Sequence, residues 1–86
     1  MKREDITNKI VKYLIQKDII HNFYNVNLDA SLSNEYGVDS LGFVDIIIYC
    51  EEEFEFEFDY IELDLSNFEN INSLVNLIEK RVGLEL

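Results

Sequence analysis

Apolar residues recur every three or four positions in three stretches of the chain, which is the pattern of amphipathic helices. The first stretch covers residues 4–18, with apolar residues at Ile6, Ile10, Val11, Tyr13, Leu14 and Ile15. The second runs from Ser40 to about Phe54, and the third covers residues 71–82. We therefore expect three main helices. Asp39 should cap the second and Asn70 the third, because both side chains accept hydrogen bonds from free amides at a helix start.

The connections between these helices have a less regular pattern. Residues 19–34 hold several asparagines, which are common in turns, and a set of apolar residues that we expect to pin this connection to the core. That set is Phe23, Tyr24, Val26, Leu28 and Leu32. After the second helix we expect a short helical turn over residues 61–65, and we expect Phe68 to pack inward.

Residues 54–60 alternate apolar and acidic side chains with a period of two, which is typical of a half-buried strand. The chain offers no second clear strand to pair with, and a lone strand would leave its backbone groups unsatisfied. We therefore interpret this segment as the end of the second helix running into an extended loop.

The second helix has more apolar residues than one buried face requires. Ile46, Cys50 and Phe54 lie four positions apart and form the expected core face. Leu41, Val44 and Ile48 lie on another face, which begins beside Ser40, and acidic residues border it. Those acids are Asp45, Glu51 and Glu52. An exposed apolar strip with a charged border is typical of a docking surface, although a covering loop would bury it instead.

The chain has 86 residues, 48% of them hydrophobic, and a formal net charge of −11. These values indicate one folded domain spanning residues 1–86 rather than a disordered segment.

No lysine or arginine lies between Asp18 and Glu79. Such an acidic surface repels nucleic acid and anionic membranes and attracts basic partners. We expect no signal peptide and no transmembrane helix, and the lone Cys50 is consistent with a cytoplasmic protein without disulfides or metal sites.

The candidate functional residue is Ser40, in the run Gly37-Val38-Asp39-Ser40-Leu41. At the first turn of a helix its hydroxyl would lie near free backbone amides and the positive end of the helix dipole. A phosphate ester at this oxygen would be stabilised there. Hydrolase chemistry is disfavoured, because His21 is the only histidine and Ser40 lacks the Gly-x-Ser-x-Gly turn.

The motif resembles the attachment site of acyl and peptidyl carrier proteins. The resemblance rests on residues 37–41, on Val44-Asp45 and Glu51-Glu52-Glu53-Phe54 downstream, and on residues 70–75 at the entry to the last helix. It extends over about residues 36–80, with chain length and helix spacing in agreement. It implies an all-α, four-helix bundle with a short third helix and a long loop between the first two.

The resemblance also implies a function. A phosphopantetheinyl transferase, using magnesium, would attach 4′-phosphopantetheine covalently to Ser40, and Asp39 would belong to the same motif. The arm would then carry acyl groups as thioesters between loading and biosynthetic enzymes, so the protein would be a carrier and not an enzyme. Partners with basic docking patches would contact Leu41, Val44, Asp45, Ile48, Glu51 and Glu52. We expect a monomer that does not insert into membranes.

Several positions depart from the commonest family pattern. Gly42 replaces an acidic residue that is usual in fatty-acid carriers, and Phe43 is bulkier than the usual small polar residue. Glu55 stands where a glycine commonly ends the second helix. A left-handed Glu would cost about 1 kcal/mol, so we expect the helix to end in another way.

The cargo remains open at this stage. Fatty acyl or polyketide intermediates are one class. Aminoacyl or peptidyl groups of a non-ribosomal or D-alanylation-type pathway are the alternative. An acidic protein-interaction module without a prosthetic group is a more remote alternative, since it explains the charge and the apolar strip but not a capped serine where they meet.

Overall fold

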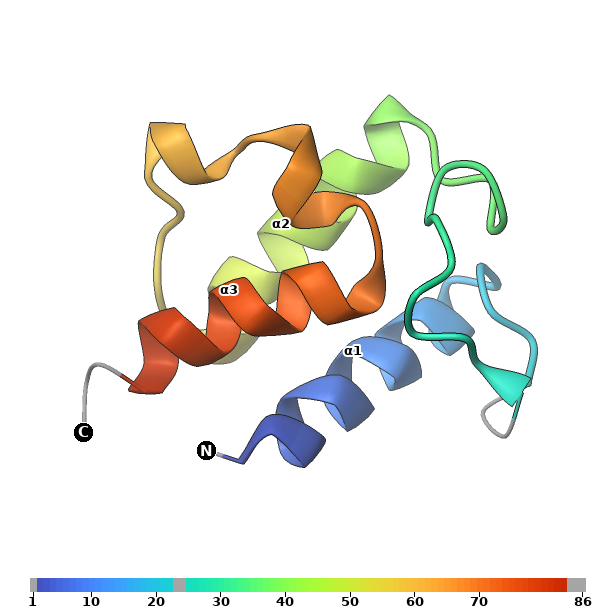
Figure 1. Ribbon diagram of the computed structural model, residues 1–86, viewed down its shortest axis with the longest axis horizontal. Coiled ribbons are helices and arrows are strands. Elements are labelled where there is room, and N and C mark those ends of the chain that lie inside the picture. Colours follow the sequence, from blue (N-terminus) through green and yellow to red (C-terminus); the bar gives the residue numbers. More distant parts are fainter. Residues whose placement is uncertain (1, 23–24, 84–86) are drawn as a thin grey trace.

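The computed structural model describes residues 2–22 and 25–83, and these residues form three α-helices and two short 3-10 turns (Figure 1). Helix α1 covers Arg3–Gln16, α2 covers Ser40–Phe54 and α3 covers Ile71–Gly83. The 3-10 turns η2 (Tyr60–Glu62) and η3 (Leu65–Phe68) lie between α2 and α3. The described part of the chain contains no strand, so the expected all-α class is confirmed, including the extended loop after α2.

A four-helix bundle is not confirmed, because two separate 3-10 turns stand where a short third helix was expected. The reason lies in two acidic caps. Asp59 and Glu62 form a capping box around η2, and the side chain of Asp64 then accepts a hydrogen bond from the amide of Ser66 to begin η3. A new helix start is therefore capped directly after the single turn of η2, and the two turns do not join into one helix.

The helices enclose one apolar core. Figure 1 shows α1 and α3 side by side and running in opposite directions, with α2 packed behind them. Each helix contributes fully buried side chains: Ile6, Ile10 and Leu14 from α1, Ile46 and Cys50 from α2, and Ile71, Leu74, Val75 and Ile78 from α3. Phe68 is buried as predicted. No helix among the described residues is both long and apolar enough to cross a membrane.

The helix ends follow the predicted caps with two differences. Asn70 accepts hydrogen bonds from the amide and the hydroxyl of Ser73, as expected of a cap. Helix α1 ends at Gln16, two residues earlier than predicted, and Asp18 takes a left-handed φ of 61°. The expectation for Glu55 was wrong: it does end α2 in the left-handed region, at φ 56° and ψ 52°. Its amide donates a hydrogen bond to the carbonyl of Glu51. Helix α2 therefore ends in the same left-handed conformation that a glycine usually adopts at this position.

The long connection before α2 is held against the start of α3. The amide of Leu32 donates to the carbonyl of Glu69 at 2.9 Å, and the amide of Asn72 donates to the carbonyl of Leu28 at 3.1 Å. Leu32 is fully buried, and Val26 and Leu28 are partly buried against the core, as predicted. Phe23 and Tyr24 lie outside the described residues. These contacts fix the chain that leads into Ser40.

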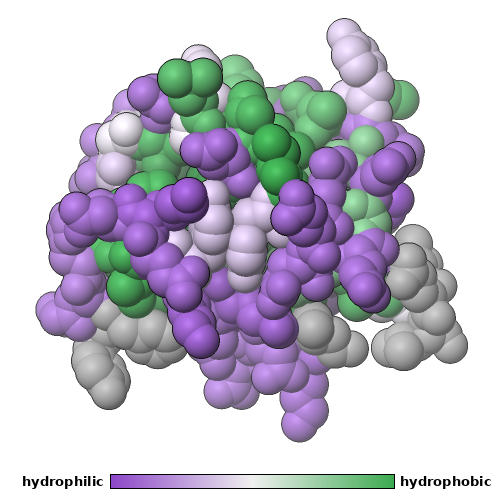
Figure 2. All heavy atoms as spheres, turned by 180° about the vertical axis from the view of Figure 1, so that it is seen from behind, coloured by the Kyte–Doolittle hydropathy of each residue, from purple (hydrophilic) through white to green (hydrophobic). Residues whose placement is uncertain are grey.

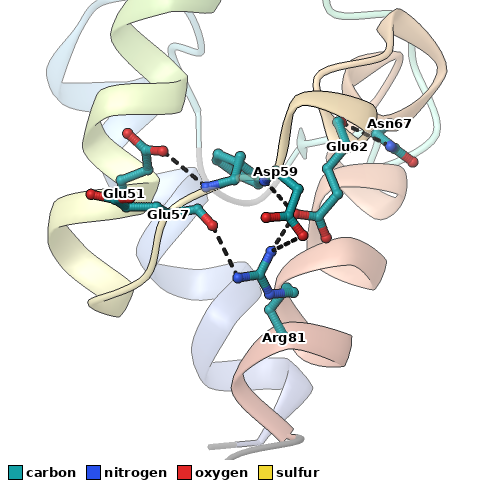
Figure 3. A network of polar contacts seen from close by, with 7 residues as sticks. Glu51, Glu57, Asp59, Glu62, Asn67 and Arg81 are labelled. Carbon is teal, nitrogen blue, oxygen red and sulfur yellow. Dashed lines mark hydrogen bonds and ion pairs between the residues drawn. The ribbon is translucent and has the colours of Figure 1, made fainter.

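Arg81 of α3 holds the loop after α2 in place (Figure 3). Its guanidinium binds the carboxylate of Glu62, lies 3.7 Å from a carboxylate oxygen of Asp59, and donates to the carbonyl of Glu57 at 3.0 Å. It also lies over the ring of Phe56, 5.2 Å from the centroid. The loop therefore has a fixed course despite its four acidic residues between positions 55 and 62.

Candidate functional site

Ser40 is the first residue of α2 and its side chain is exposed. The helix forms here because Asp39, in an extended conformation, accepts a hydrogen bond from the amide of Gly42 at 2.9 Å through its side chain. Its carbonyl accepts from the amide of Phe43 at 2.9 Å. The amides of Ser40 and Leu41 have no partner within the described residues. They remain available to an anion on Ser40.

Two glycines shape the approach to Ser40. Gly37 has a φ of 69°, a conformation in which other residues are strained, so it allows the turn that brings Val38 into the core ahead of the cap. Gly42 lies against that same valine: a Cβ added at Gly42 would lie 3.0 Å from Cγ1 of Val38. Gly42 therefore fits the tight first turn of α2, where the acidic residue usual in fatty-acid carriers would need Val38 to shift.

An open groove of about 560 Å³ lies beside Ser40. Its lining comes from residues 31–34 of the long connection, from the start of α2 and from η3. Both apolar and polar residues line it. The apolar residues are Val38, Phe43, Leu65 and Phe68, and the polar ones are Ser31, Ser33, Asn34, Asp39, Ser40, Ser66 and Glu69. The volume falls in the range of about 300–1,000 Å³ typical of clefts for small ligands.

The apolar strip on α2 is exposed, as the sequence predicted. Leu41, Val44 and Ile48 are 76%, 49% and 46% exposed. Asp45 and Glu52 are exposed beside them. Figure 2 views the molecule from the α2 side and shows apolar side chains gathered on the upper part of this face, with hydrophilic ones around and below them. Within the described residues no loop covers the strip, which removes the alternative of a wholly buried helix.

Glu51 differs from the other acidic residues that were predicted to border the strip. Its side chain is half-buried and accepts a hydrogen bond from the amide of Phe58 at 2.9 Å (Figure 3). It therefore fastens the loop after α2 to the helix. This contact gives Glu51 a structural role. A direct role of Glu51 in partner binding stays a prediction.

The remaining reactive groups have structural explanations. Cys50 is fully buried, and burial, with a smaller contribution from Glu51, raises the pKa of its thiol to about 12. Burial and then the charge of Glu53 raise the pKa of Tyr49 to about 12, and its hydroxyl donates to the carbonyl of Lys9 at 3.0 Å. His21 is exposed and pairs with Asp18. Among the described residues no group of three or more His, Cys, Asp or Glu could hold a metal ion.

The sequence did not indicate two features of this region. The groove was missed because its walls come from segments far apart in the chain, residues 31–40 and 65–69. A second exposed apolar group was also missed. It lies on η2, at the start of η3 and on the link between them, and includes Tyr60, Ile61, Leu63 and Leu65.

Comparison with known proteins agrees with this site. The family model described as a phosphopantetheine attachment site matches residues 24–80, which include Ser40, α2 and most of α3. An acyl carrier protein of Thermotoga maritima is 33% identical over 81 residues, which are 94% of this chain and 96% of that protein. The residues at the start of α2 fit the phosphopantetheine group: an exposed hydroxyl, two free amides and an adjoining groove of mixed polarity.

Proposed function

Because the chain belongs to the acyl carrier protein family, whose cofactor is covalently attached 4′-phosphopantetheine, we propose that Ser40 carries this group and that acyl intermediates travel on it. Residues 1–86 then act as one carrier domain. The carrier is a substrate of its partner enzymes and has no catalytic residues of its own. Fatty-acid, polyketide or related secondary-metabolite biosynthesis is the pathway class.

The observation that carries this proposal is the position of Ser40. Its exposed hydroxyl stands at the first residue of a capped helix, next to the free amides of Ser40 and Leu41. These amides and the helix dipole stabilise the negative charge of a phosphodiester. When bound, the group supplies a thiol on a long flexible chain, which holds an acyl group as a thioester. Asp39 keeps the helix start rigid by accepting a hydrogen bond from the amide of Gly42.

The α2 strip is proposed as the main docking surface for partners. Leu41, Val44 and Ile48 offer apolar contact, and Asp45 and Glu52 pair with lysines and arginines of a phosphopantetheinyl transferase or a loading enzyme. Exposed ion pairs contribute only about 0–1 kcal/mol each and are screened by salt. Binding is therefore weak, fast and sensitive to ionic strength, as a carrier that visits several enzymes requires.

Two observations bear on the cargo. The similar protein of Thermotoga maritima is named an acyl carrier protein, which supports an acyl cargo. Gly42 and Phe43 depart from the fatty-acid pattern, and the contact of Gly42 with Val38 gives this departure a structural basis. We therefore place the carrier in a specialised acyl pathway. Aminoacyl or peptidyl loading is the alternative, and the loading experiment separates the two.

The docking proposal is tested by the rate of modification by a broad-specificity phosphopantetheinyl transferase. Ile48→Ser and Glu52→Gln should each lower kcat/KM through a higher KM, and the loss for Glu52→Gln should shrink at high salt. Glu4→Gln removes another exposed carboxylate, from α1, and should leave the rate unchanged. Equal rates for all four proteins would refute the strip as the docking surface.

The cargo proposal is tested by loading the modified carrier with acyl and with aminoacyl groups. Malonyl or fatty acyl groups and amino acids are offered with their loading enzymes, and the mass of the carrier is followed. Loading with acyl groups, removable by hydroxylamine, is the expected result. Loading with amino acids alone would overturn the acyl proposal and establish the peptidyl alternative.

A further inference from the structure

We propose that the seam between α1 and α2 binds carboxylate side chains of an acyl-loading enzyme, next to the basic patch with which that enzyme contacts the α2 strip. The seam consists of a stacked ring pair, Tyr13 of α1 and Tyr49 of α2, with Lys9, Lys12 and Lys17 beside it. This inference rests on the proposed docking function of the α2 strip and adds a second contact, on α1, that takes the opposite charge.

The two tyrosines form an aromatic floor that the protein holds in place. Their ring centroids are 4.1 Å apart and their planes differ by 16°, so the rings stack. The hydroxyl of Tyr49 donates to the carbonyl of Lys9 at 3.0 Å, and the amine of Lys9 pairs with Glu53 at 2.8 Å. These contacts join α2 to α1 along the seam. The floor is therefore fixed before a partner binds.

A hollow of about 230 Å³ lies on either side of the ring pair, and both rings line both hollows. The first hollow is completed by Lys9, Lys12, Gln16 and Glu53. The second is completed by Lys17, Asp45, Ile48 and Glu52. Because Ile48 belongs to the α2 strip as well, the seam is continuous with that strip. A partner seated on the strip therefore reaches the seam without crossing other parts of the surface.

Lys12 and Lys17 carry positive charges that the protein itself leaves unneutralised. Both are exposed, and neither side chain has an ion pair or a hydrogen bond within the described residues. The amine of Lys17 lies over the ring of Tyr13, 5.8 Å from its centroid. An aromatic floor lowers the local dielectric constant, so a carboxylate is attracted more strongly here than by a lysine in open water. The seam is thus suited to the side chain of an aspartate or glutamate.

The opposite charges of the two helices determine how a partner can lie on the carrier. The α1 side offers Lys12 and Lys17, and the α2 side offers Asp45 and Glu52. A partner with carboxylates over α1 and cations over α2 forms ion pairs on both sides. The same partner turned half round would meet like charges on both sides, which is unfavourable. The seam therefore orients the partner relative to Ser40, which a uniformly acidic surface does not do.

The charge of the whole protein argues against two other occupants of the seam. A second copy of the chain would bring a further net charge of −11 against the first. An anionic membrane would meet two unneutralised lysines in a strongly acidic protein, and the net repulsion would dominate. An enzyme with a few carboxylates beside a basic patch avoids both repulsions.

The experiment titrates the isotope-labelled, unmodified carrier with a malonyl transferase that loads carriers of this family, and NMR gives the dissociation constant. The signals of Tyr13 and Tyr49 should shift in the parent protein. Lys12→Glu combined with Lys17→Glu should raise the dissociation constant roughly tenfold, because two attractions become two repulsions. Lys12→Arg combined with Lys17→Arg keeps both charges and should bind as the parent does.

Lys2→Glu combined with Lys80→Glu is the matched control. It changes the net charge by the same amount at two exposed lysines that lie outside both hollows. At physiological salt, charges more than about 8 Å from a partner are largely screened. The control should therefore change the dissociation constant by less than about twofold, and circular dichroism should show both double variants folded.

Equal dissociation constants for the two charge-reversed proteins would refute the seam as a docking contact. Shifts confined to the α2 strip, with Tyr13 and Tyr49 unmoved, would refute it as well. Shifts of these tyrosines that grow with the concentration of the carrier alone would assign the seam to a second copy and overturn the proposal. Because the titration uses the unmodified protein, a carrier that binds through the seam but gains no phosphopantetheinyl group would refute the proposed function alone.

Discussion

Asp39 and Gly42 are joined by a hydrogen bond of 2.9 Å, in which the side-chain oxygen of Asp39 accepts from the amide of Gly42. The same glycine leaves little space beside Val38: a Cβ added at Gly42 would lie 3.0 Å from Cγ1 of Val38. The start of α2 is thus fixed both by the hydrogen bond to Asp39 and by the close packing of Gly42 beside Val38. This rigid first turn presents Ser40 to solvent.

Removing the cap should destabilise the fold. Asp39→Ala leaves the amide of Gly42 without its partner, and loss of such a cap costs about 0.5–2 kcal/mol. The free energy of unfolding, measured by urea denaturation, should fall by that amount. Glu52→Ala removes an equally negative, exposed residue from the same helix and should change stability by less than about 0.5 kcal/mol. Equal losses in both variants would contradict the role of Asp39 as a cap.

The left-handed Glu55 offers a stabilising substitution. A residue with a Cβ pays about 1–2 kcal/mol in this conformation, whereas glycine does not. Glu55→Gly should therefore raise the free energy of unfolding by about 1 kcal/mol, after the loss of chain entropy that glycine brings. Glu52→Gly, inside the helix, should lower it by about 1 kcal/mol. A destabilised Glu55→Gly protein would show that Glu55 does not end the helix in this way.

Arg81 should contribute more to stability than a surface charge does. Its side chain is 26% exposed and that of Glu62 is 18% exposed, so their ion pair is largely shielded from water. Arg81→Met keeps an apolar stem against Phe56 but removes hydrogen bonds to Glu62 and to the carbonyl of Glu57. Bonds to charged groups contribute about 1.5–3 kcal/mol each, and we expect a loss of this order in urea denaturation.

Lys80 is the matched control for Arg81. It is the neighbouring basic residue on α3, it is exposed, and it has no ion pair within the described residues. Lys80→Met should change the free energy of unfolding by less than about 0.5 kcal/mol. If Arg81→Met were as mild as Lys80→Met, the loop after α2 would not depend on the guanidinium.

Buried Cys50 makes stability fall at alkaline pH. Burial raises the pKa of its thiol from 9.0 to about 12, so the folded state keeps the proton while the unfolded chain loses it between these values. The unfolded state then binds fewer protons, and the free energy of unfolding declines as pH rises from about 9 toward about 12. Cys50→Ala should show a shallower decline in urea denaturation over this range. The same slope for both proteins would refute the buried thiol as its source.

The sequence predicted the helices and the location of Ser40 well, because both depend on local signals. Helical periodicity, the caps Asp39 and Asn70 and the exposed faces of Leu41 and Ile48 are encoded within a few residues of one another. The alternating segment 54–60 was also interpreted correctly as a loop, since no partner strand was available.

The rest depends on contacts between distant residues, which a single sequence does not reveal. The ion cluster of Arg81 joins α3 to a loop about twenty residues earlier, and it is what lets an acidic loop keep its course. Glu55 adopts a strained conformation because α2 on one side and the anchored loop on the other fix its backbone. The groove at Ser40 arises only when η3 and residues 31–34 come together.

The central claim is that Ser40 carries the prosthetic group, and intact mass after incubation with coenzyme A, magnesium and a broad-specificity phosphopantetheinyl transferase tests it most directly. The parent protein and Ser33→Ala, which removes a neighbouring hydroxyl from the groove, should each gain one phosphopantetheinyl group. Ser40→Ala should remain folded and gain none. No gain in the folded parent with several transferases, or an equal gain in Ser40→Ala, would contradict the account.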